Sequence, residues 1–119
     1  HSCGCAFLVR WLGDSKQKID KLVLVAPWKI ADPDHPLKKR FYQVRKAFYD
    51  YPINTTIAER VGEIIYFTSD NEEDLGKKSL TLYHDILGGQ IISLTKHGHY
   101  TQDEMGTEEF PELLDVVLK

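Results

Sequence analysis

Three short runs of consecutive apolar residues predict the buried strands of a parallel sheet. Strands that are covered on both faces are apolar throughout, whereas half-exposed strands alternate apolar and polar residues. β-branched and aromatic residues dominate all three runs, and proline or glycine lies beside them. The predicted strands are KLVLVAP (21–27), EIIYFTS (63–69) and QIISLT (90–95).

The segments between these strands have the periodicity of amphipathic helices. In residues 35–51, apolar side chains recur every three or four positions, at Leu37, Phe41, Val44 and Phe48, and a proline lies near the start. A glycine pair ends the segment 74–89, as glycine often does after a helix. The predicted helices are 2–12, 35–51, 55–62, 74–89 and 110–119.

This order of elements predicts an α/β fold, a parallel sheet with flanking helices. Strands that alternate with helices over short connections imply right-handed crossovers. Residues 28–54 are longer than a simple crossover, and we interpret them as an inserted lid or side element. The first helix has no strand before it, and three parallel strands leave two sheet edges uncovered. We therefore expect residues 1–119 to form a single domain that lacks its N-terminal strands.

Composition narrows the class of protein. The chain has 119 residues, of which 42% are hydrophobic and 28% charged, and this is typical of a globular domain. A net charge of −3 argues against nucleic acid as the main partner, because phosphate binding needs clustered Lys and Arg. The densest basic stretch, 37–46, is interpreted as the solvated face of a helix rather than an RNA or membrane contact. No apolar run approaches the roughly 20 residues of a membrane span.

The cysteines and histidines do not form a metal-binding pattern. Cys3 and Cys5 lie too close together for a disulfide framework, and free thiols are typical of the reducing cytoplasm. The five histidines lack the spacing that zinc ligands have with cysteines. We expect a cytoplasmic protein without a metal.

The first four residues, HSCG, fit the x-S-x-G part of a nucleophile elbow. In that turn between strand and helix, strain exposes the serine oxygen, and glycines let neighbouring backbone approach closely. Ser2 also begins a predicted helix, whose N–H groups and dipole favour a developing negative charge. We expect Ser2 to be a nucleophile and the Cys3 N–H to be an oxyanion donor. A serine that only caps the helix is the alternative.

An acid is expected directly after the second strand. Hydrolases with an elbow on this architecture place serine, acid and histidine in that order along the chain. Asp70 follows the apolar run 63–69 at once, so we predict it to be the acid. Glu72, Glu73 and Asp74 are rivals, of which Asp74 is well placed to cap the next helix.

The histidine is expected on the loop after the last strand. His97 and His99 both lie there, and we predict His99 to be the base because Gly98 gives the backbone freedom to turn its ring toward the serine. A paired metal site with no evident third ligand, or a solvated loop, is the alternative. Active sites of open α/β sheets lie at the carboxyl ends of the strands, where all three predicted residues fall.

The chain resembles the small serine hydrolases of the YdeN and retinoblastoma-binding-protein type, a compact α/β-hydrolase family. The matching stretches are HSCG, KLVLVAP, FYDYPINTTIAERVGEIIYFTSDNEED, GGQIISLTKHGHYT and EEFPELLDVVLK. The resemblance implies a nucleophile at Ser2, an acid at Asp70 and a base at His99, and that this chain is the C-terminal part of an α/β-hydrolase fold. The acid loop departs from the family, which tends to have two acids and then an apolar-Pro segment, where this chain has Asn71 and EEDLG.

These residues predict a carboxylesterase-like enzyme that hydrolyses small acyl esters, thioesters or amides without a cofactor. Trp28, Phe41 and Tyr42 are candidates for the acyl pocket, although core packing accounts for such aromatic residues equally well. The competing hypothesis is a non-catalytic module that uses the same fold to bind a protein partner.

Overall fold

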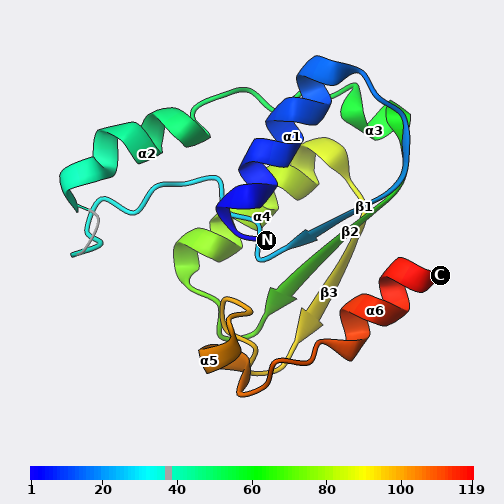
Figure 1. The fold of residues 1–119 in the computed structure, drawn as a ribbon. Helices are drawn as coiled ribbons and strands as arrows, with labels where there is room; N and C mark the ends of the chain where they lie inside the picture. The colour runs from blue at the N-terminus through cyan, green and yellow to red at the C-terminus, as the bar shows by residue number, and fades with distance from the viewer. Residues whose placement is uncertain (37–38) are drawn as a thin grey trace.

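Three parallel strands form a single sheet in a computed structural model that describes residues 1–36 and 39–119. The strands are β1 (Ile19–Val25), β2 (Val61–Ser69) and β3 (Gln90–Leu94), in the spatial order β1-β2-β3 (Figure 1). Both pairs are parallel, so the carboxyl ends of all three strands lie at one edge of the sheet. Segments that follow the strands are therefore brought together at that edge.

Helices cover both faces of this sheet. The helices are α1 (Cys3–Ser15), α2 (Tyr42–Tyr49), α3 (Ile57–Arg60), α4 (Asp74–Leu87), α5 (Gln102–Met105) and α6 (Pro111–Leu118), with a 3₁₀ turn at Lys39–Phe41. Figure 1 shows α1 and α4 on one face, α6 on the other, and α2 set apart from the sheet. Within residues 1–36 and 39–119, no helix is long and apolar enough to span a bilayer.

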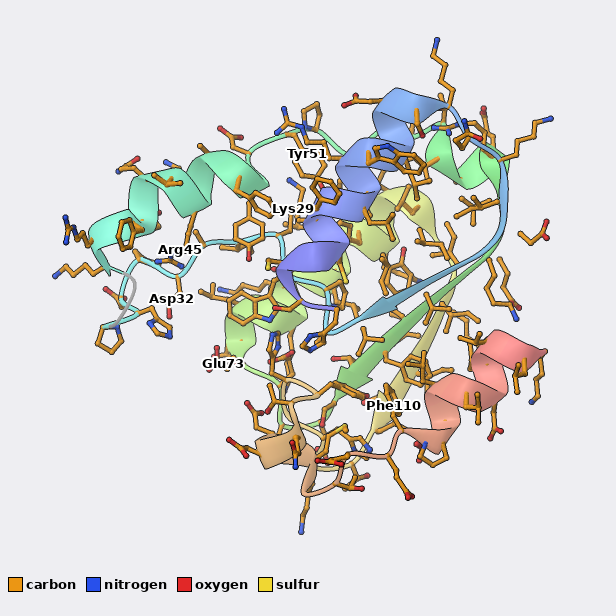
Figure 2. The ribbon with its side chains drawn as sticks, in the orientation of Figure 1. Lys29, Asp32, Arg45, Tyr51, Glu73 and Phe110 are labelled. Atoms are coloured by element: carbon orange, nitrogen blue, oxygen red, sulfur yellow. The ribbon has the colours of Figure 1, made fainter. Side chains whose placement is uncertain are left out.

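Lys29, a half-buried lysine, ties the segment before α2 to the segment after it. Lys29 Nζ donates to the carbonyl oxygen of Tyr51 at 2.8 Å and to that of Tyr49, and it lies 3.9 Å from the centre of the Tyr51 ring (Figure 2). The Tyr51 hydroxyl in turn donates to the Ala6 carbonyl of α1 at 2.6 Å. Burial lowers the pKa of Lys29 from its ordinary value. Residues 28–54 are thus anchored at both sides of α2, and their role as a lid stays a prediction.

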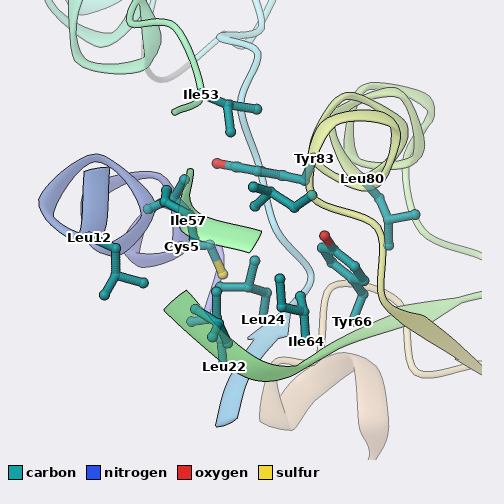
Figure 3. Close-up of a cluster of buried hydrophobic side chains, with 13 residues drawn as sticks. Cys5, Leu12, Leu22, Leu24, Ile53, Ile57, Ile64, Tyr66, Leu80 and Tyr83 are labelled. Carbon is teal, nitrogen blue, oxygen red and sulfur yellow. The ribbon is translucent and has the colours of Figure 1, made fainter. Parts of the chain in front are cut away.

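The larger hydrophobic core lies between the sheet and the helices α1, α3 and α4 (Figure 3). The strands contribute inward-facing side chains such as Leu24 and Tyr66, and α4 contributes Tyr83; all three are fully buried. The Tyr83 hydroxyl donates to the Trp28 carbonyl at 3.0 Å, so this core also fixes the start of the segment after β1.

The smaller core lies on the opposite face and supports the loop after β3. Phe67 of β2 packs on Phe110 with ring centres 5.0 Å apart, and Tyr100 packs on Phe110 at 5.2 Å. The Tyr100 hydroxyl also donates to the Thr68 carbonyl. Tyr100, the residue next to His99, is therefore firmly packed in this core.

Several predicted boundaries differ from the structure. In place of the helix predicted over 35–51, the structure has the 3₁₀ turn Lys39–Phe41 followed by α2, which ends at Tyr49. Positions 37 and 38 lie outside the described residues. The helix predicted over 55–62 ends at Arg60, because Val61 pairs with Ile19 and already belongs to β2. The short helix α5 was not predicted; Thr101 caps it by accepting from the Glu104 N–H at 3.2 Å.

Candidate active site

Ser2 occupies a strained turn at the entrance to α1. Its backbone angles are φ 55° and ψ −126°, a combination that residues with a Cβ rarely adopt. The Ser2 N–H donates to the Val25 carbonyl at 2.9 Å, which fixes the turn against the end of β1. This is the geometry that a nucleophile elbow needs. An added Cβ at Gly4 would meet no atom within 4 Å, so no described residue makes the close approach expected there.

His99 lies directly against this serine. Its Nε2 atom is 2.7 Å from Ser2 Oγ, within hydrogen-bond distance. Gly98 before it has φ +55°, a left-handed conformation that turns the chain at this point. The backbone N–H of His99 donates to Glu104 Oε2 at 2.6 Å, so α5 holds the histidine from behind.

The acid beside His99 is Glu72, and the expectation that Asp70 would occupy this place is wrong. His99 Nδ1 lies 2.9 Å from Glu72 Oε2, and the Glu72 side chain is only 2% exposed. The carboxylate of Asp70 instead accepts from the Lys96 N–H at 2.8 Å. The structure therefore brings together Ser2, His99 and Glu72.

The reason for this shift is the path of the chain after β2. The Asp70 N–H donates to the Leu94 carbonyl at 3.1 Å, so Asp70 still continues the pairing with β3 and faces the end of that strand. The chain then turns, with the Glu72 N–H donating to the Ser69 carbonyl at 3.2 Å. Only after this turn does a carboxylate face the histidine. The sequence signal was the departure from the family pattern at Asn71.

Ser69 and Asn71 join the acid loop to the histidine loop. Ser69 Oγ, in a side chain that is buried, accepts from the N–H groups of His97 at 2.8 Å and Gly98 at 3.1 Å. Asn71 Oδ1 also accepts from the Gly98 N–H at 2.8 Å. These bonds fix the backbone that carries His99, and the sequence predicted this bridging role for neither residue.

The other predicted histidine lies away from the serine. The His97 ring packs against Tyr100 and Phe110, with ring centres 5.3 Å and 6.3 Å apart, and its Nδ1 is 2.8 Å from the Thr95 carbonyl oxygen. In the part of the chain that the structure describes, no cluster of three or more His, Cys, Asp or Glu side chains could hold a metal ion.

Comparison with known proteins places the chain in a family. The family model described as serine hydrolase matches residues 1–119. The chain belongs to the serine hydrolase family. A search of curated protein sequences found no match.

The fold of this chain is similar to a solved structure, that of the ydeN gene product from B. subtilis. The TM-score is 0.80 at 17% sequence identity, and the match covers 99% of this chain and 61% of that one. The prediction of a three-stranded parallel sheet with flanking helices, as in an α/β-hydrolase, is therefore confirmed. The chain spans about three fifths of the solved relative.

The three aromatic residues predicted to line an acyl pocket lie in different places. Trp28 contacts His99, with its Nε1 3.1 Å from His99 Nδ1. Tyr42 lines a hollow of about 270 Å³ with Lys29 and Leu82, whereas Phe41 is 55% exposed. The structure therefore does not bring the three together into one pocket.

Proposed function

We propose that this chain carries the catalytic centre of a hydrolase that cleaves small acyl esters, thioesters or amides, with Ser2, His99 and Glu72 as the triad. The observation that carries the proposal is the unbroken line of contacts, 2.7 Å from Ser2 Oγ to His99 Nε2 and 2.9 Å from His99 Nδ1 to Glu72 Oε2. A nucleophile, a base and an orienting acid at hydrogen-bond distances are what acyl transfer needs. Membership of the serine hydrolase family supports it.

Acylation begins when Ser2 Oγ attacks the carbonyl carbon of the substrate. His99 Nε2 takes the hydroxyl proton, and the Nδ1–H donates to Glu72, whose carboxylate stabilises the imidazolium. His99 then gives the proton to the leaving group as its bond to the acyl carbon breaks. Water, deprotonated by His99, attacks the acyl-serine. His99 then returns that proton to Ser2 Oγ as its bond to the acyl carbon breaks, which releases the carboxylic acid and the free Ser2 hydroxyl.

The developing oxyanion is stabilised by the N-terminus of α1. Cys3 is the first residue of this 13-residue helix, and N–H groups of the first turn have no acceptor within the helix. The helix dipole adds a partial positive charge at the same end. We assign the Cys3 N–H as one oxyanion donor; a donor is worth about 10²- to 10³-fold in kcat in a well-studied protease.

A fluorophosphonate probe on the full-length protein tests the proposal. It reacts with an activated serine, so the wild-type protein should be labelled and Ser2→Ala should not. Ser93→Ala, an exposed serine on β3, is the matched control and should be labelled like wild type. Folded wild-type protein that takes up no probe contradicts the proposal and favours the alternative, a non-catalytic module that binds a protein partner.

A further inference from the structure

The Nδ1 atom of His99 faces two partners of opposite character. Glu72 Oε2 lies 2.9 Å away and Trp28 Nε1 lies 3.1 Å away, with the indole N–H directed at the same nitrogen. A carboxylate accepts hydrogen bonds, an indole N–H only donates, and an imidazole nitrogen carries either a proton or a lone pair. Glu72 and Trp28 therefore cannot both be satisfied by Nδ1 at the same time.

Each partner selects a different tautomer of His99. With the proton on Nδ1, the ring donates to Glu72 and the Nε2 lone pair accepts from Ser2, which is the form that acylation requires. With the proton on Nε2, the Nδ1 lone pair accepts from Trp28. In this second form Nε2–H points at Ser2 Oγ, and His99 cannot take the serine proton.

The indole is held in this place by the surrounding fold. The backbone of Trp28 makes two hydrogen bonds. Its carbonyl accepts from the buried Tyr83 hydroxyl at 3.0 Å, and its backbone N–H donates to the Ser2 carbonyl at 3.4 Å. The next residue is also fixed, because the Lys29 N–H donates to Ser79 Oγ at 2.9 Å. The backbone of Trp28 is therefore anchored on both sides.

We propose that Trp28 is a positioning residue that opposes Glu72 in setting which nitrogen of His99 carries the proton. The proposal rests on the proposed function for its effect on turnover. A hydrogen bond to a charged group is about twice as strong as a neutral one, so Glu72 holds the larger share of His99 in the productive form. The indole N–H stabilises the rest of the His99 population in the Nε2–H tautomer. It also disfavours the imidazolium form of His99, in which an Nδ1–H would face the indole N–H.

The test removes the indole N–H without changing the shape of the ring. Site-specific replacement of Trp28 by benzothienylalanine puts a sulfur atom in place of the N–H. The ¹⁵N NMR signals of His99, assigned by their loss in His99→Asn, report which nitrogen is protonated. The measurement is most sensitive in the Glu72→Gln protein, where the charged competitor is absent and the proton should move toward Nε2.

In that Glu72→Gln protein, benzothienylalanine at position 28 should raise the ratio of the Nδ1–H to the Nε2–H form about tenfold, the effect of one lost neutral hydrogen bond. With Glu72 intact, the same replacement should raise kcat for a p-nitrophenyl ester several-fold and leave KM within about twofold. The matched control is the same replacement at Trp11, a half-exposed residue of α1, which should change neither quantity.

An unchanged tautomer ratio in folded protein would overturn the inference, and so would a lower kcat with the ratio moved toward Nε2–H. The NMR measurement does not depend on turnover. A protein that hydrolyses no ester but shows the tenfold shift therefore contradicts the proposed function alone, and the inference about Trp28 stands.

Discussion

Gly76 leaves open the space that the side chain of Glu72 fills. A Cβ at position 76 would lie 2.7 Å from Glu72 Cδ and 2.8 Å from its Cγ, closer than side chains pack, and 2.9 Å from Trp28 Nε1. Gly76 lies in the first turns of α4, where glycine is less favourable than alanine by roughly 0.5–1 kcal/mol. The glycine is therefore explained by the buried carboxylate beside it and not by helix stability.

Gly76→Ala should separate stability from activity. The methyl group displaces the Glu72 carboxylate from His99, and we expect the rate of fluorophosphonate labelling to fall by about 10²-fold, the cost of misplacing a catalytic group by about 1 Å. Circular dichroism should show the helices intact. Lys78→Ala, on the exposed side of the same helix, is the control and should keep the wild-type rate. Wild-type labelling of Gly76→Ala would show that Glu72 does not need this space.

Replacing each of the two candidate acids by its amide, one at a time, tests the assignment of Glu72. Glu72→Gln removes the charge that supports imidazolium, and turnover of a p-nitrophenyl ester should fall by about 10⁴-fold, as in a protease with the same triad logic. Asp70→Asn keeps an oxygen that can accept from the Lys96 N–H, so turnover should stay within a few-fold of wild type. If Asp70→Asn abolished turnover in folded protein and Glu72→Gln did not, the original expectation of Asp70 would be restored.

Substitution of the two histidines in the loop after β3 should affect different properties, turnover for His99 and stability for His97. His99→Ala removes the base, so ester turnover should drop by about 10³-fold or more with little change in melting temperature. His97→Ala removes a ring that packs on Tyr100 and Phe110, so melting temperature should fall by a few degrees while turnover is largely kept. Steady-state kinetics and thermal denaturation on both variants check this. A larger loss of turnover in His97→Ala would mean that the wrong histidine has been assigned.

Lys29→Met should loosen the region around α2. The variant loses the bonds from Nζ to the Tyr49 and Tyr51 carbonyls, and we expect chymotrypsin to cut between residues 41 and 49 several-fold faster. Chymotrypsin cuts after aromatic residues, so the removed lysine is not itself a cleavage site. Lys46→Met, an exposed lysine on α2, is the control and should be cut at the wild-type rate. Equal cleavage of the two variants would show that Lys29 does not anchor the segment.

The strands could be predicted from the sequence because their burial on both faces leaves a continuous apolar run. Residues 63–69 and 90–95 were placed within two residues of β2 and β3. The contact between Ser2 and His99 followed from the elbow pattern and from the fact that parallel strands bring their carboxyl ends to one edge. Both signals are local in sequence and need no knowledge of how a loop turns.

The acid could not be placed in the same way. Asp70 and Glu72 are two residues apart, and which of them faces His99 depends on the turn between them and on space made by Gly76 in the next helix. The contact of Trp28 with His99 joins positions 71 apart in the chain and leaves no periodic signal. Such pairings are fixed by tertiary packing, which a reading of propensity and spacing does not contain.

The positive φ of Ser2 lowers the stability of the fold, but it is the conformation that the proposed activity requires. A backbone at φ 55° and ψ −126° costs on the order of 1–3 kcal/mol for a residue with a Cβ, and glycine would relieve that cost. Glycine at position 2 would thus give the most heat-resistant form of this turn, and it would remove the hydroxyl that we propose as the nucleophile. Under the proposed function, a screen that selects only for heat resistance would favour inactive variants at this position. Stability would have to be added elsewhere, in the two cores, with Ser2 left strained.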